Sequence, residues 1–345
     1  MAEATDLERA PAIARPSAVR RTPRGLPGVE LQILIAIAIL ATTFSITFPD
    51  SFATSGTLLN MARVSSIMLD VAIGQAFALI VGGFDISVGS TMGLVSIAVA
   101  LLMKTGMDVP LAAILATLVG TAVGLINGIG IALFRITPFV MTLGVLTAAR
   151  GLADELANGR VITGFPRVFV MYGRAMWGPI PSATCIALVV LVISWIILQR
   201  IRVGLYIFAI GGSRETTRVA GIPVALYEMI AYALCGTMAG VGGVMLTSRV
   251  GVAQGSLGQG YELLSVATAV IGGVLIGGGV GRLTGVVLGV ILITVLNTGL
   301  DIAGVNPFLQ QIVTGLVLIL AVLLSQARTG SIRKVMRGLS LRRPG

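Results

Sequence analysis

The sequence predicts an all-α, polytopic membrane protein with about ten transmembrane helices, arranged as two five-helix halves in an inverted repeat. Of its 345 residues 56% are hydrophobic and only 11% are charged, whereas soluble domains are about one quarter charged. Apolar stretches of about 20 residues, long enough to cross a bilayer, follow one another along the chain. The two halves also share a short pattern of Gly, Asn and Pro-Phe.

Apolar stretches separated by polar or glycine-rich residues define ten predicted spans. They are residues 31–48, 58–82, 88–103, 110–134, 138–157, 180–200, 225–248, 261–280, 283–300 and 306–325. An even number of spans returns the chain to its starting side, so both ends of the transmembrane domain, 31–325, are expected on one side of the membrane.

Basic residues at both ends of the chain indicate which side that is. The net charge is +10, and Arg or Lys residues cluster in 1–30, read as a disordered tail, and in the basic tail 326–345. Because basic flanks stay in the cytoplasm, both tails are predicted to be cytoplasmic. Several arginines fall outside under this assignment and count against it: Arg63, Arg160, Arg167, Arg174 and Arg249.

The predicted inverted repeat rests on spans four and nine. Span four contains Gly120, Gly124, Asn127 and Gly128 and is followed by Pro138-Phe139; span nine contains Gly285, Gly289, Asn297 and Gly299 and is followed by Pro307-Phe308. Five spans in each half give the halves opposite orientations, as in many transporters. The glycine stripe of span four is read either as tight packing within one subunit or as a contact between subunits.

Several classes of site are excluded by composition. The chain has no His, which removes Ser-His-Asp catalysis and His-ligated metals. Neither of its two Lys, Lys104 and Lys334, follows a Gly, so the phosphate-binding GxxxxGK loop is absent and the chain does not bind ATP in that way. No catalytic residue, metal or cofactor is predicted, and the basic tails favour a membrane surface over nucleic acid.

A polar island interrupts the apolar sequence at 211–221. It opens on Gly211-Gly212, closes at Gly221 before Pro223, and contains five polar residues that we take as a contact surface: Arg214, Glu215, Thr216, Thr217 and Arg218. These boundaries predict a short helix outside the membrane. Its cytoplasmic placement by the span count indicates that it docks a soluble partner.

Polar residues inside the spans are candidates for a wet path. Asp70 lies near the middle of span two, where a carboxylate must face the bundle interior or a cavity; it is read as an ion site or as a hydrogen-bonded structural group. Gln75 lies five residues further on. The break at 81–90 contains Gly82-Gly83, and Asp85 or Ser87 could cap the next helix. The break is an ordinary turn or an irregular element that borders the path.

Glu262 follows a glycine-rich segment on the predicted outer side. Gly255, Gly258 and Gly260 precede it. The carboxylate either caps the N-terminus of its own helix or acts in an outer gate.

Taken together, these motifs resemble the membrane permeases of bacterial ABC sugar importers of the ribose, xylose, arabinose and galactofuranose type. The resemblance covers about residues 50–325 and rests on six motifs in the same order. They are residues 82–90 (GGFDISVGS), 138–144 (PFVMTLG) with 149–151, 204–222, 260–263 (GYEL), 277–282 and 297–300 (NTGL).

The resemblance implies transport of a neutral monosaccharide across the bacterial inner membrane, with no chemical step on the sugar. It implies three partners: an ABC ATPase subunit, a periplasmic or lipid-tethered sugar-binding protein, and a second permease subunit, identical or different. The polar island would be the helix that contacts the ATPase. The proposed path residues are Asp70, Gln75, Asp85, Asn127, Thr142, Glu262, Asn297 and Gln311.

Two other functions fit the same composition. One is an ABC permease for nucleosides or branched-chain amino acids. The other is an ion-coupled secondary transporter that uses Asp70 and Glu262 as coupling sites.

Overall fold

The computed structural model describes residues 28–328 as thirteen helices and one two-stranded ribbon. The elements are α1 (Val29–Thr47), α2 (Ser55–Ile80), α3 (Val88–Lys104), α4 (Val109–Ala132), α5 (Pro138–Leu156), α6 (Arg167–Arg174), β1 (Met176–Trp177), β2 (Ile180–Pro181), α7 (Ser182–Arg200), α8 (Arg202–Gly212), α9 (Arg214–Val219), α10 (Val224–Val250), α11 (Tyr261–Ile271), α12 (Leu283–Ile302) and α13 (Pro307–Arg328). β1 and β2 are antiparallel, with Met176 opposite Pro181.

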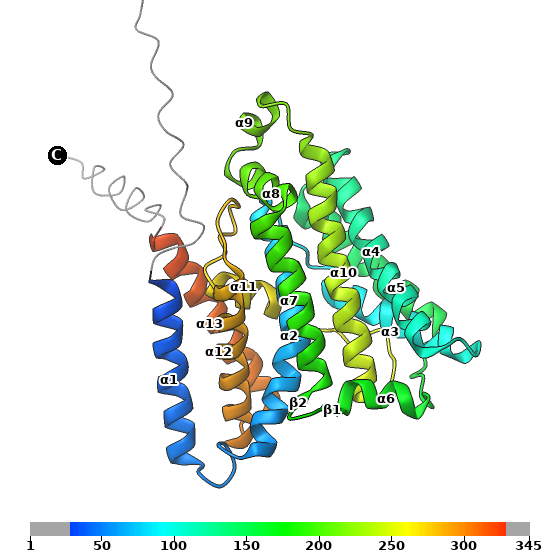
Figure 1. Ribbon diagram of the computed structural model, residues 1–345, viewed down its shortest axis with the longest axis vertical. Coiled ribbons are helices and arrows are strands. Elements are labelled where there is room, and N and C mark those ends of the chain that lie inside the picture. The colour runs from blue at the N-terminus through cyan, green and yellow to red at the C-terminus, as the bar shows by residue number, and fades with distance from the viewer. Residues whose placement is uncertain (1–27, 329–345) are drawn as a thin grey trace, which may run out of the picture.

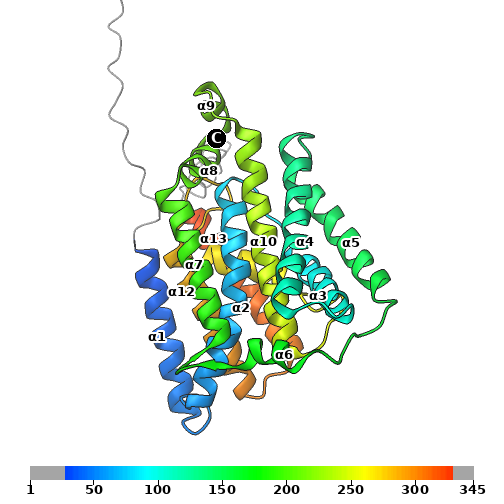
Figure 2. The ribbon, with the colours of Figure 1, turned by 45° about the vertical axis from the view of Figure 1, so that its right-hand side comes forward.

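The helices form an elongated bundle with two distinct ends. Figure 1 shows α9 at the end where α1 begins and α13 finishes, and α6 with the ribbon at the opposite end; Figure 2 shows the same arrangement after rotation. We call these the α9 end and the α6 end. The predicted tails lie almost entirely outside the described residues.

A helix occurs in each of the ten predicted spans. Within 28–328, six helices have the length and hydropathy of a membrane span: α1, α2, α4, α7, α10 and α12. Local chemistry sets several of their starts. Thr54 caps α2 by accepting a hydrogen bond from the Thr57 amide at 3.2 Å, while Pro138 and Pro307 occupy the first positions of α5 and α13, where a missing N–H is tolerated.

The predicted span 261–280 is wrong in its second half. α11 ends at Ile271, and a glycine-rich loop, 272–282, follows it. Gly273, Gly278 and Gly279 have φ values of 84°, 84° and 74°, which a right-handed helix cannot contain. At 1.5 Å per residue α11 is only about 16 Å long, too short to cross a hydrocarbon core of about 30 Å by itself.

The predicted helix 211–221 is shorter than expected. Gly211-Gly212 closes α8, and the new helix, α9, covers Arg214–Val219. Ser213 separates them with an extended backbone and caps α9, since its Oγ accepts from the Thr216 amide at 3.3 Å. Gly221, with φ of 79°, ends the segment, as predicted.

Helix α6 and the ribbon, which the apolar pattern did not predict, explain three arginines at the α6 end. The Arg174 guanidinium donates to the carbonyls of Arg249 and Val250 at 2.7 and 2.9 Å, at the end of α10. Arg249 donates to Asn60 Oδ1 at 3.1 Å, and Arg63 reaches the sulfur of Met176 at 3.2 Å. Arg174 and Arg63 thus hold α6 and the ribbon against α10 and α2, while Arg249 joins α10 to α2.

Glycine contacts bring α4 and α10 together within the chain. A Cβ atom on Gly124 would lie 2.9 Å from Cα of Gly236, and one on Gly120 would lie 2.9 Å from Cα of Gly240. A Cβ atom on Gly128 would lie 2.7 Å from Cα of Met229, which is also on α10. The glycine stripe therefore packs within one subunit, the first of its two interpretations.

We expect Gly236→Ala to lower the melting temperature of the purified chain. Its Cβ would lie 2.7 Å from the Gly124 nitrogen, and overpacking of this kind costs about 1–3 kcal/mol. Gly144→Ala is the matched control, because Gly144 is also helical and a Cβ added there would meet no atom within 4 Å. Equal melting temperatures for the two variants would contradict the α4–α10 packing.

Candidate functional site

A buried polar cluster closes the break between α2 and α3. Asp85 Oδ1 accepts hydrogen bonds from the Ser87 amide at 2.7 Å and from the Ser87 hydroxyl at 2.6 Å. Asn127, on α4, donates to Asp85 Oδ2 at 3.1 Å and to Ser87 Oγ at 2.9 Å. All three residues are buried, so the cluster ties the start of α3 to α4.

Gln75 completes this cluster from α2. Its side-chain amide, oriented by its hydrogen bonds, donates to the Asp85 carbonyl at 3.0 Å and accepts from the Asp85 amide at 3.1 Å. Backbone groups at a helix break inside a membrane need partners within the protein. Three of the predicted path residues, Gln75, Asp85 and Asn127, thus meet in space, and each has a structural partner there. Their role in the path is still a prediction.

Four glycines from three segments meet at the α9 end; we call them the glycine junction: Gly82, Gly211, Gly278 and Gly279. A Cβ on Gly278 would lie 2.8 Å from Cα of Gly82 and 2.9 Å from Cα of Gly211. The Gly279 amide donates to the carbonyl of Ile80, the last residue of α2, at 2.8 Å. The junction places the end of α8 in backbone contact with the end of α2 and with the loop 272–282.

Helix α9 combines two anchoring residues with a solvent-facing pair. Arg214 forms a 2.7 Å ion pair with Glu228 of α10, whose side chain is only 7% exposed. Thr217 is buried, and its hydroxyl donates to the Ser213 carbonyl at 2.8 Å. Glu215 and Arg218 pair across one turn at 3.6 Å, with side chains 76% and 52% exposed.

The solvent face of α9 also contains apolar surface. Val219, its last residue, is 80% exposed, and Thr216 is exposed as well. A short capped helix with an exposed charge pair beside an exposed Val presents a mixed surface of the kind found at protein contacts.

Glu262 lies at the N-terminus of α11. Its Oε2 accepts a hydrogen bond from the Gly260 amide at 3.0 Å, so it caps its own helix, as one of its two interpretations predicted. The same carboxylate lies against Gly89, which packs with Gly258 where α3 meets the loop before α11. The outer gate at Glu262 stays a prediction.

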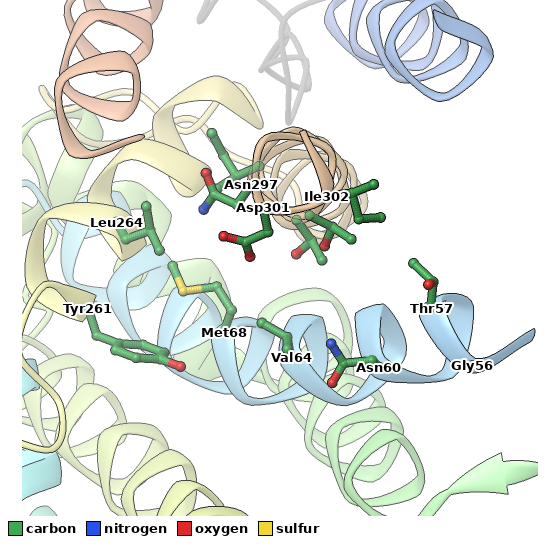
Figure 3. Close-up of a pocket in the computed structure, with 13 residues that line it drawn as sticks. Gly56, Thr57, Asn60, Val64, Met68, Tyr261, Leu264, Asn297, Asp301 and Ile302 are labelled. Atoms are coloured by element: carbon green, nitrogen blue, oxygen red, sulfur yellow. The ribbon is translucent and has the colours of Figure 1, made fainter. Parts of the chain in front are cut away.

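A pocket of about 310 Å³ opens between α2, α11 and α12, towards the α6 end. Figure 3 shows Asn297 and Asp301 extending from α12 into the space above α2, with Tyr261 and Leu264 of α11 on one side. The residues that line it are Gly56, Thr57, Asn60, Val64, Met68, Tyr261, Leu264, Ile293, Thr294, Asn297, Thr298, Asp301 and Ile302. Most of the polar ones carry hydroxyl or amide groups, and none is basic.

The remaining predicted path residues lie apart from one another. Asp70 is 1% exposed within α2, and its Oδ1 has no hydrogen-bond partner among the described residues. The buried Thr142 donates to the Pro138 carbonyl of its own helix at 2.8 Å. Gln311 is exposed on α13. Only Asn297 lines the pocket.

Sequence reasoning missed most of the pocket and the partner of Arg214. The face of α12 was readable in principle, because Thr294, Asn297, Thr298 and Asp301 recur at helical spacing. The pocket itself could not be predicted, because its other walls, α2 and α11, lie elsewhere in the sequence. Only one feature of the sequence could have pointed to Glu228 as a functional residue: it is a carboxylate near the start of a long apolar helix.

Comparison with known proteins gives a consistent result along most of the chain. The family described as "Branched-chain amino acid transport system / permease component" matches residues 57–322. The ribose import permease protein of Bacillus subtilis (strain 168) is 36% identical over 302 residues, which cover 87% of this chain and 94% of that protein.

Two further relatives are named for other sugars. The D-allose transport system permease protein of Escherichia coli (strain K12) is 34% identical over 84% of this chain and 89% of its own length. The galactose/methyl galactoside import permease protein of Salmonella typhimurium is 33% identical over 87% and 94%. No solved structure matches the chain significantly.

Replacing Asp85 with Ala should destabilise the protein strongly. The Ser87 amide and hydroxyl and the Asn127 amide would lose an acceptor in a buried site, at about 1–3 kcal/mol for each donor left unpaired. Thermal unfolding of the purified chain measures the effect. Asp108→Ala is the control, since Asp108 is exposed and makes no capping hydrogen bond; an Asp85 variant as stable as this control would refute the structural role of the cluster.

Proposed function

The chain belongs to the family of branched-chain amino acid transport system permease components, and we propose that it is the permease subunit of an ABC importer for a monosaccharide. A separate ATPase subunit would drive the transport. The observation that carries this proposal is similarity over nearly the whole chain to permeases named for ribose, allose and galactose, at 33–36% identity. The chain would act as a transport subunit and would not alter the sugar chemically.

A sugar is a better substrate assignment than a branched-chain amino acid. The description of the family names amino acids, but the relatives that align over 84–87% of this chain are named for sugars. The ion-coupled alternative, with Asp70 as coupling site, is less favoured because it gives no function to the exposed helix α9.

We assign the contact with the ATPase subunit to helix α9. Arg214 would hold α9 on the bundle through its 2.7 Å ion pair with Glu228 of α10. Thr217 would stabilise α9 itself, since its hydroxyl donates to the Ser213 carbonyl at 2.8 Å. Glu215, Thr216 and Arg218 are exposed and would contact the ATPase. The glycine junction would pass a displacement of α8 and α9 to the end of α2, because the backbones touch there.

We further propose ten membrane crossings in two inverted halves of five. α11 together with the loop 272–282 would form the eighth crossing, since an irregular backbone is tolerated at membrane depth where protein surrounds it. Pro138-Phe139 and Pro307-Phe308 begin α5 and α13, the last crossing of each half. The α9 end would face the cytoplasm, with both termini on that side of the bacterial inner membrane.

The complex would contain this chain, a second permease subunit, the ATPase, and a periplasmic or lipid-tethered sugar-binding protein. Sugar would enter at the α6 end. Asn297 is the strongest path candidate because it lines the pocket. Glu262 is a second candidate, although its carboxylate lies against Gly89 of α3 and not in the pocket lining. The other proposed path residues are Asp70, Gln75, Asp85, Asn127, Thr142 and Gln311.

The double variant Glu215→Ala/Arg218→Ala tests the proposed coupling. Since both side chains are exposed and pair with each other, the fold should be retained while the contact with the ATPase is lost. We expect co-purification of the ATPase and ATP-dependent sugar uptake by proteoliposomes each to fall at least about tenfold, the equivalent of about 1.4 kcal/mol.

Glu155→Ala/Arg160→Ala is the control pair, because both residues are exposed in a segment remote from α9 along the chain. It should keep the ATPase bound. Normal uptake by the α9 variant would exclude α9 as the coupling element.

A further inference from the structure

We propose that the pocket between α2, α11 and α12 is a receiving subsite that binds one sugar ring as it enters the permease. This inference rests on the proposed function and deepens it, since a permease could also pass sugar from its binding protein without holding it. The evidence is the chemistry of the lining, an unpaired buried acceptor, the size of the pocket and its position.

The lining offers hydrogen-bonding groups without a cation. Asn60, Thr294, Asn297 and Thr298 supply amides and hydroxyls, and Asp301 supplies a carboxylate. Sugar hydroxyls both donate and accept, so they match such a mixture. Because no Arg or Lys lines the pocket, an anionic ligand such as a lipid phosphate would find no partner charge there.

Asn297 points to a ligand most directly. Its Oδ1 is buried and accepts no hydrogen bond within the described residues. An unpaired buried acceptor costs about 1–3 kcal/mol. A small rotation of the Asn297 side chain would turn Oδ1 to the pocket, where a hydroxyl of a bound ring could donate to it and remove that cost. Asp301 is pre-oriented beside it, because Gln310 donates to its Oδ1 at 2.7 Å.

The opposite side of α12 explains why this polar face is held towards α2. Gly299 lies directly against the ring of Phe44 on α1. That contact packs the opposite side of α12 against α1, so its polar residues lie on the pocket side, as Figure 3 shows for Asn297 and Asp301.

Size and position agree with a receiving site for a monosaccharide. The volume of about 310 Å³ is at the lower end of the range for small-molecule pockets, about 300–1,000 Å³. The lining includes Gly56 and Thr57 at the start of α2 and Asp301 and Ile302 at the end of α12. These residues lie towards the α6 end, which the proposed topology assigns to the side from which sugar arrives. Tyr261 adds a flat apolar ring on which the carbon face of a sugar could pack.

The test is sugar binding by the purified full-length chain in detergent, without its binding protein. D-ribose, D-allose and D-galactose are titrated separately while the melting temperature is followed. At least one should raise the melting temperature in a saturable way. Leucine and sodium chloride serve as probes for the amino-acid and ion alternatives; a shift of equal size with either would overturn the proposal, as would no shift with any of the three sugars.

Variants locate the binding. Thr298→Val replaces a hydroxyl by a methyl group of similar size, and Asn297→Leu removes the amide. Each variant should need an about tenfold higher sugar concentration to reach half of the maximal shift in melting temperature. This is the loss of affinity expected when one good hydrogen bond is removed. Gln259→Leu is the control: Gln259 is exposed and does not line the pocket, and its titration should match that of the unaltered chain.

If Asn297→Leu does not fold, Thr298→Val decides the question alone. Unchanged titrations in the folded pocket variants would place the binding elsewhere and refute the subsite. Failure of the broader proposal looks different, because the unaltered chain with its ATPase and binding protein would then show no ATP-dependent sugar uptake at all.

Discussion

The backbone at the break between α2 and α3 has to find its hydrogen-bond partners inside the protein, and much of the structure is arranged around that requirement. In lipid no water is available to an open helix end. The Gln75 side chain therefore forms hydrogen bonds with both the amide and the carbonyl of Asp85, while the Asp85 carboxylate accepts hydrogen bonds from Ser87 and Asn127. One irregular turn thus joins three helices, and neighbouring Gly83 allows Tyr232 of α10 and Pro138 of α5 to approach it.

Helix α2 connects the two ends of the bundle that matter for the proposed transport. At its C-terminus the carbonyl of Ile80 accepts a hydrogen bond from Gly279 in the glycine junction, beside the end of α8. At its N-terminal half it forms one wall of the pocket. Residues 66–80 are buried throughout, so one continuous, packed helix joins the glycine junction to the pocket.

Glycine has two structural roles in this protein, one inside helices and one in a loop. On α4 and α10 it lets two helices approach until their backbones touch, which replaces the water-driven packing that is missing in lipid. In the loop 272–282, positive φ values end α11 early and turn the chain back towards α8. A side chain would be excluded at both kinds of position, but only the glycines of α4 and α10 are compatible with a helix that continues through them. An apolar window with many glycines therefore does not by itself predict a full membrane span.

The sequence alone determined the mostly helical membrane architecture, the helix in each predicted span, a short helix within 211–221 and the family, because hydropathy, caps and prolines act within a few residues. It also marked Asp85, Asn127, Asn297 and Glu262 as unusual. It could not say that Gln75 and Asn127 meet at Asp85, that Arg214 pairs with Glu228, or that α2, α11 and α12 enclose a pocket. Helices that are apolar all round carry little directional pattern, so which faces meet is decided by packing between distant segments. Which helices touch and which buried polar side chains pair can therefore be identified only from the tertiary structure.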